Sequence, residues 1–176
     1  MPSRRFRPVG SLGEAARHRI VVLAYEVAPV VASVGGFLCD RAREGWDVSV
    51  LVSTPADTRP LTILGVSVHP SAADVETLLA EIPAGTTVAV QDRMLDADGS
   101  IRHLLRALAL RPDVTVAVWG ECGPARPDAI DHRPTVAAAA FKAHALRAAS
   151  GTDPRCAAVE VLHRVHAGSL RRLYPV

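Results

Sequence analysis

Short runs of apolar, often β-branched residues alternate along the chain with segments in which apolar residues recur every three or four positions. The first pattern is typical of strands buried on both faces, and the second of amphipathic helices. The run 20–25 is the clearest strand, and the segment 37–44, followed by Gly45, is the clearest helix. The same patterns predict strands at 47–53, 61–69, 86–90 and 113–119, and helices at 72–82, 100–110, 135–150 and 154–173.

This order of elements predicts an α/β protein. A strand, a helix and a second strand form a βαβ unit, in which the crossover is right-handed and the strands are parallel. Repetition of the unit predicts a three-layer α/β/α sandwich with a mainly parallel, Rossmann-like sheet. Residues 1–18 mix Arg, Pro, Gly and Ser without periodicity, so we expect a flexible basic arm before a single domain over 19–176.

Composition narrows the class of protein. Of the 176 residues, 49% are hydrophobic and 22% charged, and the net charge is +2, which disfavours both disorder and nucleic-acid binding. The sequence has no apolar stretch near the ~20 residues of a membrane span and no signal-peptide pattern. Cys39, Cys122 and Cys156 are odd in number and widely spaced, which favours a reducing compartment. We therefore expect a cytoplasmic protein.

Ligands of open parallel sheets bind beyond the carboxyl ends of the strands, which predicts a site in the loops after residues 25, 53, 90 and 119. The first of these loops leads to Gly35 and Gly36, which we expect to open a helix. Backbone N–H groups without a nearby Cβ can approach an anion or a sugar hydroxyl closely there. The sequence contains neither GxGxxG nor GxxxxGK[ST], so dinucleotide and P-loop sites are disfavoured.

Two segments resemble the LmbE/PIG-L family of N-deacetylases. Ala24-Tyr-Glu-Val-Ala-Pro-Val-Val-Ala-Ser-Val-Gly-Gly36, followed by a helix and Glu44-Gly-Trp-Asp-Val-Ser-Val50, is similar to that family's opening segment. Ala129-Ile-Asp-His-Arg133 is similar to part of its second metal motif, His-x-Asp-His-Arg. The resemblance spans roughly residues 19–150 and implies the family's fold. In an active member it also implies zinc-dependent hydrolysis of N-acylated amino sugars or related compounds.

The resemblance aligns Glu26 with the family's first zinc-binding His, and His132 with its last. Ala28 takes the place of the general-base Asp, Pro29 that of the zinc-binding Asp, and Ala129 that of the outer His of the second motif. Zinc hydrolysis needs three protein ligands, an open position for water and a carboxylate base. Of the aligned positions, only Glu26 and His132 can bind a metal.

Two such ligands alone would bind a metal weakly. If the chain does hold zinc, the predicted ligands are Glu26 and His132, with Asp131 or Glu121 as a replacement base. If this prediction holds, these side chains surround one pocket together with Asp92. A separate metal clip is conceivable at residues 160, 163 and 166, although a solvated helix is the simpler interpretation there.

Three functions stay open at this point. The favoured one is a catalytically impaired deacetylase-like domain that acts as a binding, scaffolding or regulatory subunit, because the base and two ligand positions are lost together. The second is an active zinc-dependent amide hydrolase of N-acylated amino sugars, related glycoconjugates or natural products. The third is an oligomer-forming interaction protein without a small ligand, which associates through Leu170 and Leu173 of the apolar last helix.

Overall fold

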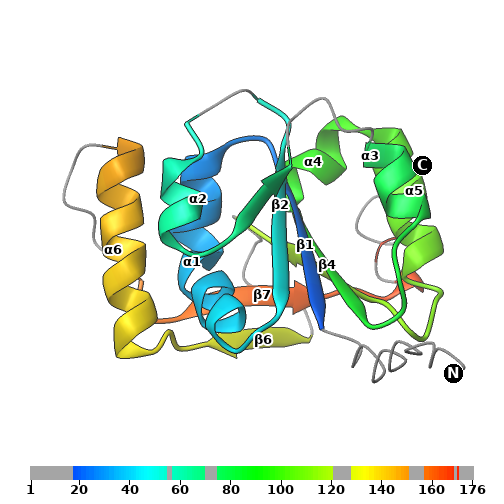
Figure 1. The fold of residues 1–176 in the computed structure, drawn as a ribbon. Coiled ribbons are helices and arrows are strands. Elements are labelled where there is room, and N and C mark those ends of the chain that lie inside the picture. The colour runs from blue at the N-terminus through cyan, green and yellow to red at the C-terminus, as the bar shows by residue number, and fades with distance from the viewer. Residues whose placement is uncertain are drawn as a thin grey trace, which may run out of the picture.

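The computed structural model describes residues 18–54, 57–69, 75–120, 128–150, 157–168 and 170. They form a three-layer sandwich in which helices cover both faces of one seven-stranded sheet (Figure 1). The strands are β1 (Arg19–Ala24), β2 (Asp47–Val52), β3 (Ser67–His69), β4 (Thr86–Gln91), β5 (Thr115–Trp119), β6 (Ala129–His132) and β7 (Glu160–Arg164). The helices are α1 (Val27–Arg43), α2 (Arg59–Ile63), α3 (Val75–Ala80), α4 (Asp92–Ala97), α5 (Gly99–Leu108) and α6 (Val136–Ser150).

The strand order is β3-β2-β1-β4-β5-β7-β6, and the first five of these strands are parallel. In the centre of the sheet Val22 lies opposite Val50 on one side and Ala89 on the other. Strand β7 is antiparallel to both β5 and β6, so the sheet is mixed at one edge. The predicted α/β class and the mainly parallel sheet are confirmed.

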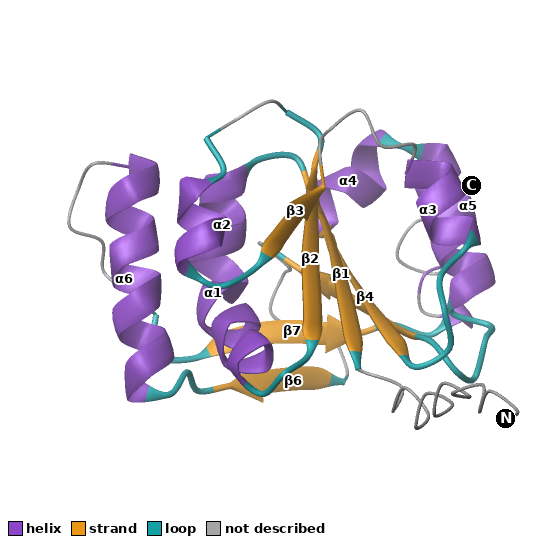
Figure 2. Cartoon of the chain, in the orientation of Figure 1, coloured by secondary structure: helices purple, strands orange, loops and turns teal. Residues whose placement is uncertain are grey.

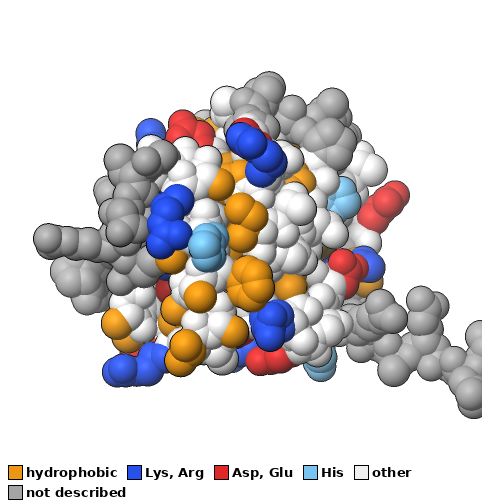
Figure 3. Space-filling model, turned by 60° about the vertical axis from the view of Figure 1, so that its left-hand side comes forward, with side chains coloured by type: hydrophobic (Ala, Val, Ile, Leu, Met, Phe, Trp, Pro, Cys, Tyr) orange, Lys and Arg blue, Asp and Glu red, His pale blue; other side chains and the backbone are white. Residues whose placement is uncertain are grey.

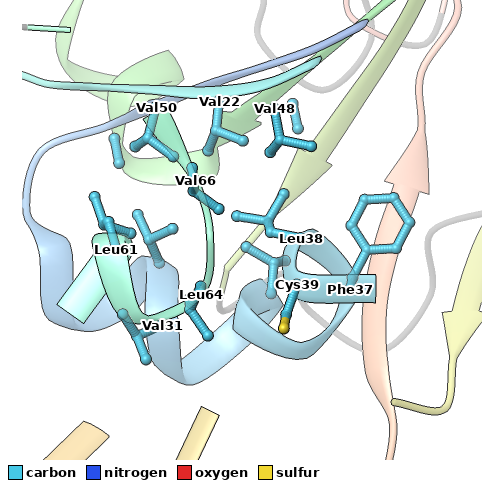
Figure 4. Close-up of a cluster of buried hydrophobic side chains, with 14 of the residues drawn as sticks. Val22, Val31, Phe37, Leu38, Cys39, Val48, Val50, Leu61, Leu64 and Val66 are labelled. Atoms are coloured by element: carbon cyan, nitrogen blue, oxygen red, sulfur yellow. The ribbon is translucent and has the colours of Figure 1, made fainter. Parts of the chain in front are cut away.

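Two apolar cores hold the layers together, one on each face of the sheet. Helices α1, α2 and α6 cover one face and α3, α4 and α5 the other (Figure 2). In the first core Leu38 of α1 and Leu61 and Leu64 of the α2 region pack on β1 and β2, while Phe37 stands at the margin beside β7 (Figure 4). Burial of aliphatic side chains on both faces explains why β1, β2, β4 and β5 read as continuous apolar runs.

Helix α1 begins earlier than the sequence pattern indicates. Glu26 is its N-cap, with an extended backbone, and Pro29 lies in the first turn, where a missing N–H group costs nothing. Gly35 and Gly36 therefore lie inside the helix, and the expectation that they open it is wrong. A Cβ on Gly36 would lie 2.5 Å from Pro134 Cγ, so this glycine permits the close approach of the chain that leads into α6.

The last part of the described chain also differs from expectation. The predicted helix over 154–173 is wrong for residues 160–164, which form the strand β7. Residues three apart on a strand point to opposite faces, so Glu160 and His163 cannot form the considered metal clip. Leu170 is buried, so it is not available for the expected association, and Leu173 lies outside the described residues.

The remaining differences are local. Residues 61–69, expected as a strand, divide between α2 and the short strand β3, and α4 has no counterpart in the sequence pattern.

The predicted single domain over 19–176 stays a prediction, because part of that range is outside the described residues. Among the helices that the structure describes, none has the length and apolar character that a membrane crossing requires.

Candidate functional site

The carboxyl ends of β1, β4 and β5 meet at one edge of the sheet, where the sequence predicts a site. The backbone N–H of Tyr25 donates to Gln91 Oε1 at 3.0 Å, and the Gln91 side chain is buried. Asp92 follows at the start of α4, with its carboxylate directly against Gly120, whose φ is +132°. This edge therefore brings together one buried amide and one carboxylate, which packs against the backbone of Gly120 where any other residue would place a Cβ.

One of the predicted site residues lies at this edge, directly after β1. Glu26 is exposed at the N-terminus of α1 and makes no side-chain capping hydrogen bond. Glu121, one of the two predicted replacement bases, lies outside the described residues. Ala28 and Pro29, in the first turn of α1, offer no side-chain donor or acceptor.

His132 lies elsewhere, at the end of β6. Its Nε2 donates to Asp40 Oδ2 at 3.0 Å, and its ring meets the edge of the Phe37 ring at a centroid distance of 5.3 Å. Thr135 donates twice to the same carboxylate, from its N–H to Oδ2 at 3.0 Å and from its hydroxyl to Oδ1 at 2.6 Å. His132 is thus part of a network that joins β6, the start of α6 and the last turns of α1.

Electrostatics reinforce this network. Burial alone would raise the pKa of Asp40, but the hydrogen bonds from Thr135 and His132 outweigh it, and the pKa lies below its ordinary value of 3.8. The neighbouring thiol of Cys39 has a raised pKa, because of burial first and the negative charge of Asp40 next. The carboxylate is therefore ionised and fully engaged, and Cys39 is not an activated nucleophile.

Glu26 and His132 do not fit a shared zinc site. Glu26 caps one end of α1 and Asp40, the partner of His132, lies near the other end, which separates them by ~21 Å along the helix at 1.5 Å per residue. Zinc ligands lie within about 2.3 Å of the ion. Asp131 is exposed and alternates with His132 on β6, so it points to the opposite face of the strand.

A second buried cluster lies one helical turn away from Asp40. Lys142 Nζ of α6 donates to Glu160 Oε1 of β7 at 2.5 Å, and both side chains are almost completely buried. The N–H groups of Gly36 and Phe37 donate to the two Glu160 oxygens at 2.9 and 2.6 Å. The expected approach of an anion to the glycine pair is therefore made by a side chain of the chain itself.

Sequence reasoning missed Asp40, Thr135 and Lys142 of this second region and considered Glu160 only as a metal ligand on a helix. One signal was present: Lys142 is the only lysine of the sequence and stands in an otherwise apolar stretch of α6. A buried lysine requires a carboxylate partner. Within the described residues, no three His, Cys, Asp or Glu side chains lie close enough together to hold a metal ion.

A groove of about 630 Å³ opens on the other face of the sheet, between α3 and the strands β1 to β3. Ser49, Ser67 and His69 line it, together with the ion pair of Arg19 and Asp47. Its position beside the first residues of β1 and β2 places it away from the carboxyl edge where the sequence predicts the site.

Comparison with known proteins identifies relatives of the fold. The sequence matches no model of a known protein family and no curated protein. The structure is similar to that of the A40926 pseudoaglycone deacetylase, with a TM-score of 0.53 and 14% identity over 83% of this chain and 96% of that one. It is also similar to a deacetylase–teicoplanin complex from the teicoplanin pathway, with a TM-score of 0.53 and 12% identity over 84% of this chain and 99% of that one.

The chain therefore has the fold of these deacetylases, as the LmbE/PIG-L resemblance implies. At 12–14% identity, the similarity of the structures establishes the shared fold alone. The function of the site residues has to be inferred from their own geometry.

Proposed function

We propose that this chain is a non-hydrolytic binding domain built on the deacetylase fold, and that it acts as a binding, scaffolding or regulatory subunit. The observation that supports the proposal is the position of His132. It is bound to Asp40 near the end of α1, while Glu26 lies at the beginning of that helix, ~21 Å away by helix length. A domain with this arrangement lacks the ligand set that the family's hydrolytic chemistry requires.

The ligand that this proposal favours is a small amide or an amino sugar at the carboxyl edge of the sheet. Gln91 and Asp92 supply hydrogen-bonding groups there, and Gly120 permits the close approach of the Asp92 carboxylate to the backbone. Amides and amino sugars carry both donors and acceptors, which match a carboxylate and a carboxamide. Recognition without turnover needs no metal ion and no general base.

Association with a second protein belongs to the same proposal. The outward face of α6 carries exposed Val136 and Phe141, and apolar side chains lie between basic ones on this side of the molecule (Figure 3). An exposed apolar strip on a helix is a surface on which a partner or a second copy can pack.

The scattered cysteines suit a cytoplasmic location, which we also propose.

The proposal is tested by metal content and hydrolysis together. The tag-free protein is incubated with zinc, desalted and measured by elemental mass spectrometry beside Glu26→Ala and His132→Ala, and all three are assayed for deacetylation of N-acetylglucosamine and N-acyl glucosamines. We expect no zinc retention that depends on either residue and no hydrolysis. Near-stoichiometric zinc that is lost in both variants, accompanied by hydrolysis, would instead establish an active amide hydrolase.

Ligand binding is measured separately by saturation-transfer NMR with N-acetylglucosamine and glucosamine. We expect binding by the wild-type protein that Asp92→Asn weakens and Asp131→Asn leaves unchanged, since Asp131 lies on the outer strand β6. Equal weakening by both substitutions would contradict a site at the carboxyl edge.

A further inference from the structure

A groove of about 450 Å³ lies at the opposite edge of the sheet, beside the first residues of β4 and β5. Its floor is the face of the sheet itself. Thr87 and Thr115 are direct neighbours on adjacent strands, so both hydroxyls are on this face, and the buried Ala117 and Leu162 continue the floor. The volume falls within the range of about 300–1,000 Å³ that is usual for small-molecule sites.

One wall of the groove presents a guanidinium group that is fixed in place. The Arg41 guanidinium carbon lies 5.3 Å from the centre of the Phe37 ring and 5.2 Å from that of Trp46, and its Nη1 donates to Glu44 at 2.5 Å. The Trp46 ring is itself stacked on His18 at 4.6 Å. A guanidinium held by rings and one carboxylate keeps further N–H donors for a ligand without losing side-chain freedom on binding.

A second guanidinium enters from β7. Arg164 lines the groove and is exposed, and in the part of the chain that the structure describes no carboxylate pairs with it. Asp113 also lines the groove, but both of its oxygens are bound by Arg111, at 3.1 and 2.6 Å. Because Arg41 is paired with Glu44 and Asp113 with Arg111, Arg164 is the one of these lining charges without a counter-ion among the described residues.

The apolar surface limits what the ligand can be. Ile130 and Leu162 are paired on β6 and β7 and, with Ala117, form an aliphatic patch next to the threonines. Planar ring systems such as nucleobases gain from stacking on an aromatic face, but Trp46 and Phe37 already stack on His18 and Arg41. A short aliphatic chain needs no such face.

We infer that this groove is a binding site for a small aliphatic carboxylate. The carboxylate group is bound by Arg41, Arg164 and the threonine hydroxyls, because a guanidinium fork matches the two oxygens of a carboxylate. The aliphatic body lies on Ala117, Ile130 and Leu162. The site is at the amino-terminal edge of the parallel strands, and it is independent of the ligand proposed for the carboxyl edge.

The test is a titration with hexanoate, hexanamide and acetate, followed by two-dimensional amide NMR of the ¹⁵N-labelled protein. Hexanamide keeps the aliphatic body without the charge, and acetate keeps the charge without the body. We expect saturable shifts of the Thr87, Thr115 and Leu162 amides with hexanoate, and affinities at least about tenfold weaker for the other two compounds.

Two variants and one control complete the experiment. Arg164→Gln should weaken hexanoate binding about tenfold, Thr115→Val should weaken it less, and the exposed control Arg59→Gln should leave it unchanged, with dispersed spectra showing that all three are folded. Equal hexanoate affinity in Arg164→Gln, equal affinity for hexanamide, or shifts confined to residues outside the groove would each overturn the inference. None of these outcomes depends on zinc or on binding at the carboxyl edge.

Discussion

At the carboxyl edge of the sheet Glu26 is exposed, whereas at the junction of α1, α6 and β7 the carboxylates of Asp40 and Glu160 are buried and each receives three hydrogen bonds. His132, the residue that most resembles a zinc ligand, belongs to the second region. In this structure His132 therefore contributes to the stability of the fold. The predictions that follow test this division between an edge open to ligands and a junction that stabilises the fold.

The largest effect is expected at the buried ion pair. Glu160→Gln leaves the Lys142 ammonium group buried without its countercharge, so we expect a loss of about 3–5 kcal/mol in the free energy of unfolding. Urea denaturation at pH 7 measures it. The control is Asp57→Asn, which removes the solvent-screened ion pair with Arg59 and should leave the free energy of unfolding nearly unchanged. Similar losses in both variants would contradict a stabilising role for the junction.

The glycine pair in the middle of α1 tests how tightly the junction is packed. Gly36→Ala places a Cβ 2.5 and 2.7 Å from the Pro134 ring, and we expect it to destabilise the protein by about 3 kcal/mol. Gly35→Ala meets only the end of Leu64 at 3.3 Å, so its strain is offset by the better helix propensity of alanine, about 1 kcal/mol. Thermal denaturation of the two variants compares them, and equal melting temperatures would be inconsistent with a tight α1–α6 junction.

Acid should weaken the junction through Asp40. Its pKa is lowered in the folded protein, so its stabilising contribution is complete above the unfolded value of about 3.9 and is lost as the pH falls through the lower folded value. Asp40→Asn should cost about 2 kcal/mol at pH 7. The difference between wild type and variant should then shrink below about pH 4. A difference that is constant from pH 7 to pH 3 in urea titrations would show that the charge does not matter.

The smallest effect is expected at the carboxyl edge. Glu26→Ala removes an exposed side chain that caps nothing, and stability should stay within about 0.5 kcal/mol of wild type. His132→Ala removes a hydrogen bond to an ionised carboxylate and a contact with Phe37, which should cost about 1.5–3 kcal/mol. Chemical denaturation of the pair compares them, and a reversed order of the two losses would place His132 outside the stabilising network.

Much of the fold could be predicted because β1, β2, β4 and β5 are buried on both faces and leave uninterrupted apolar runs in the sequence. The strand β7 has no such run, since Val161 and Arg164 are exposed and only alternate residues are buried. The start of α1 was missed because Pro29 resembles a helix breaker, although it is tolerated in a first turn.

The candidate site could be predicted only in part for a topological reason. Positions along the chain indicate that loops after parallel strands meet, and Tyr25, Gln91 and Gly120 do so. They do not reveal that the twisted sheet carries β7 and β6 across the direction of β1 and brings His132 to the far end of α1 (Figure 1). Long-range pairing of this kind leaves no local pattern.

Burial of Lys142 also provides a way to measure how often α6 separates from β7. It is the only lysine of the sequence, and its side chain is 1% exposed. Reagents that acylate side-chain amines therefore find their single target only when α6 separates from β7. The rate of labelling at Lys142, followed by mass spectrometry, would give the frequency of that separation directly, without a dye or a denaturant.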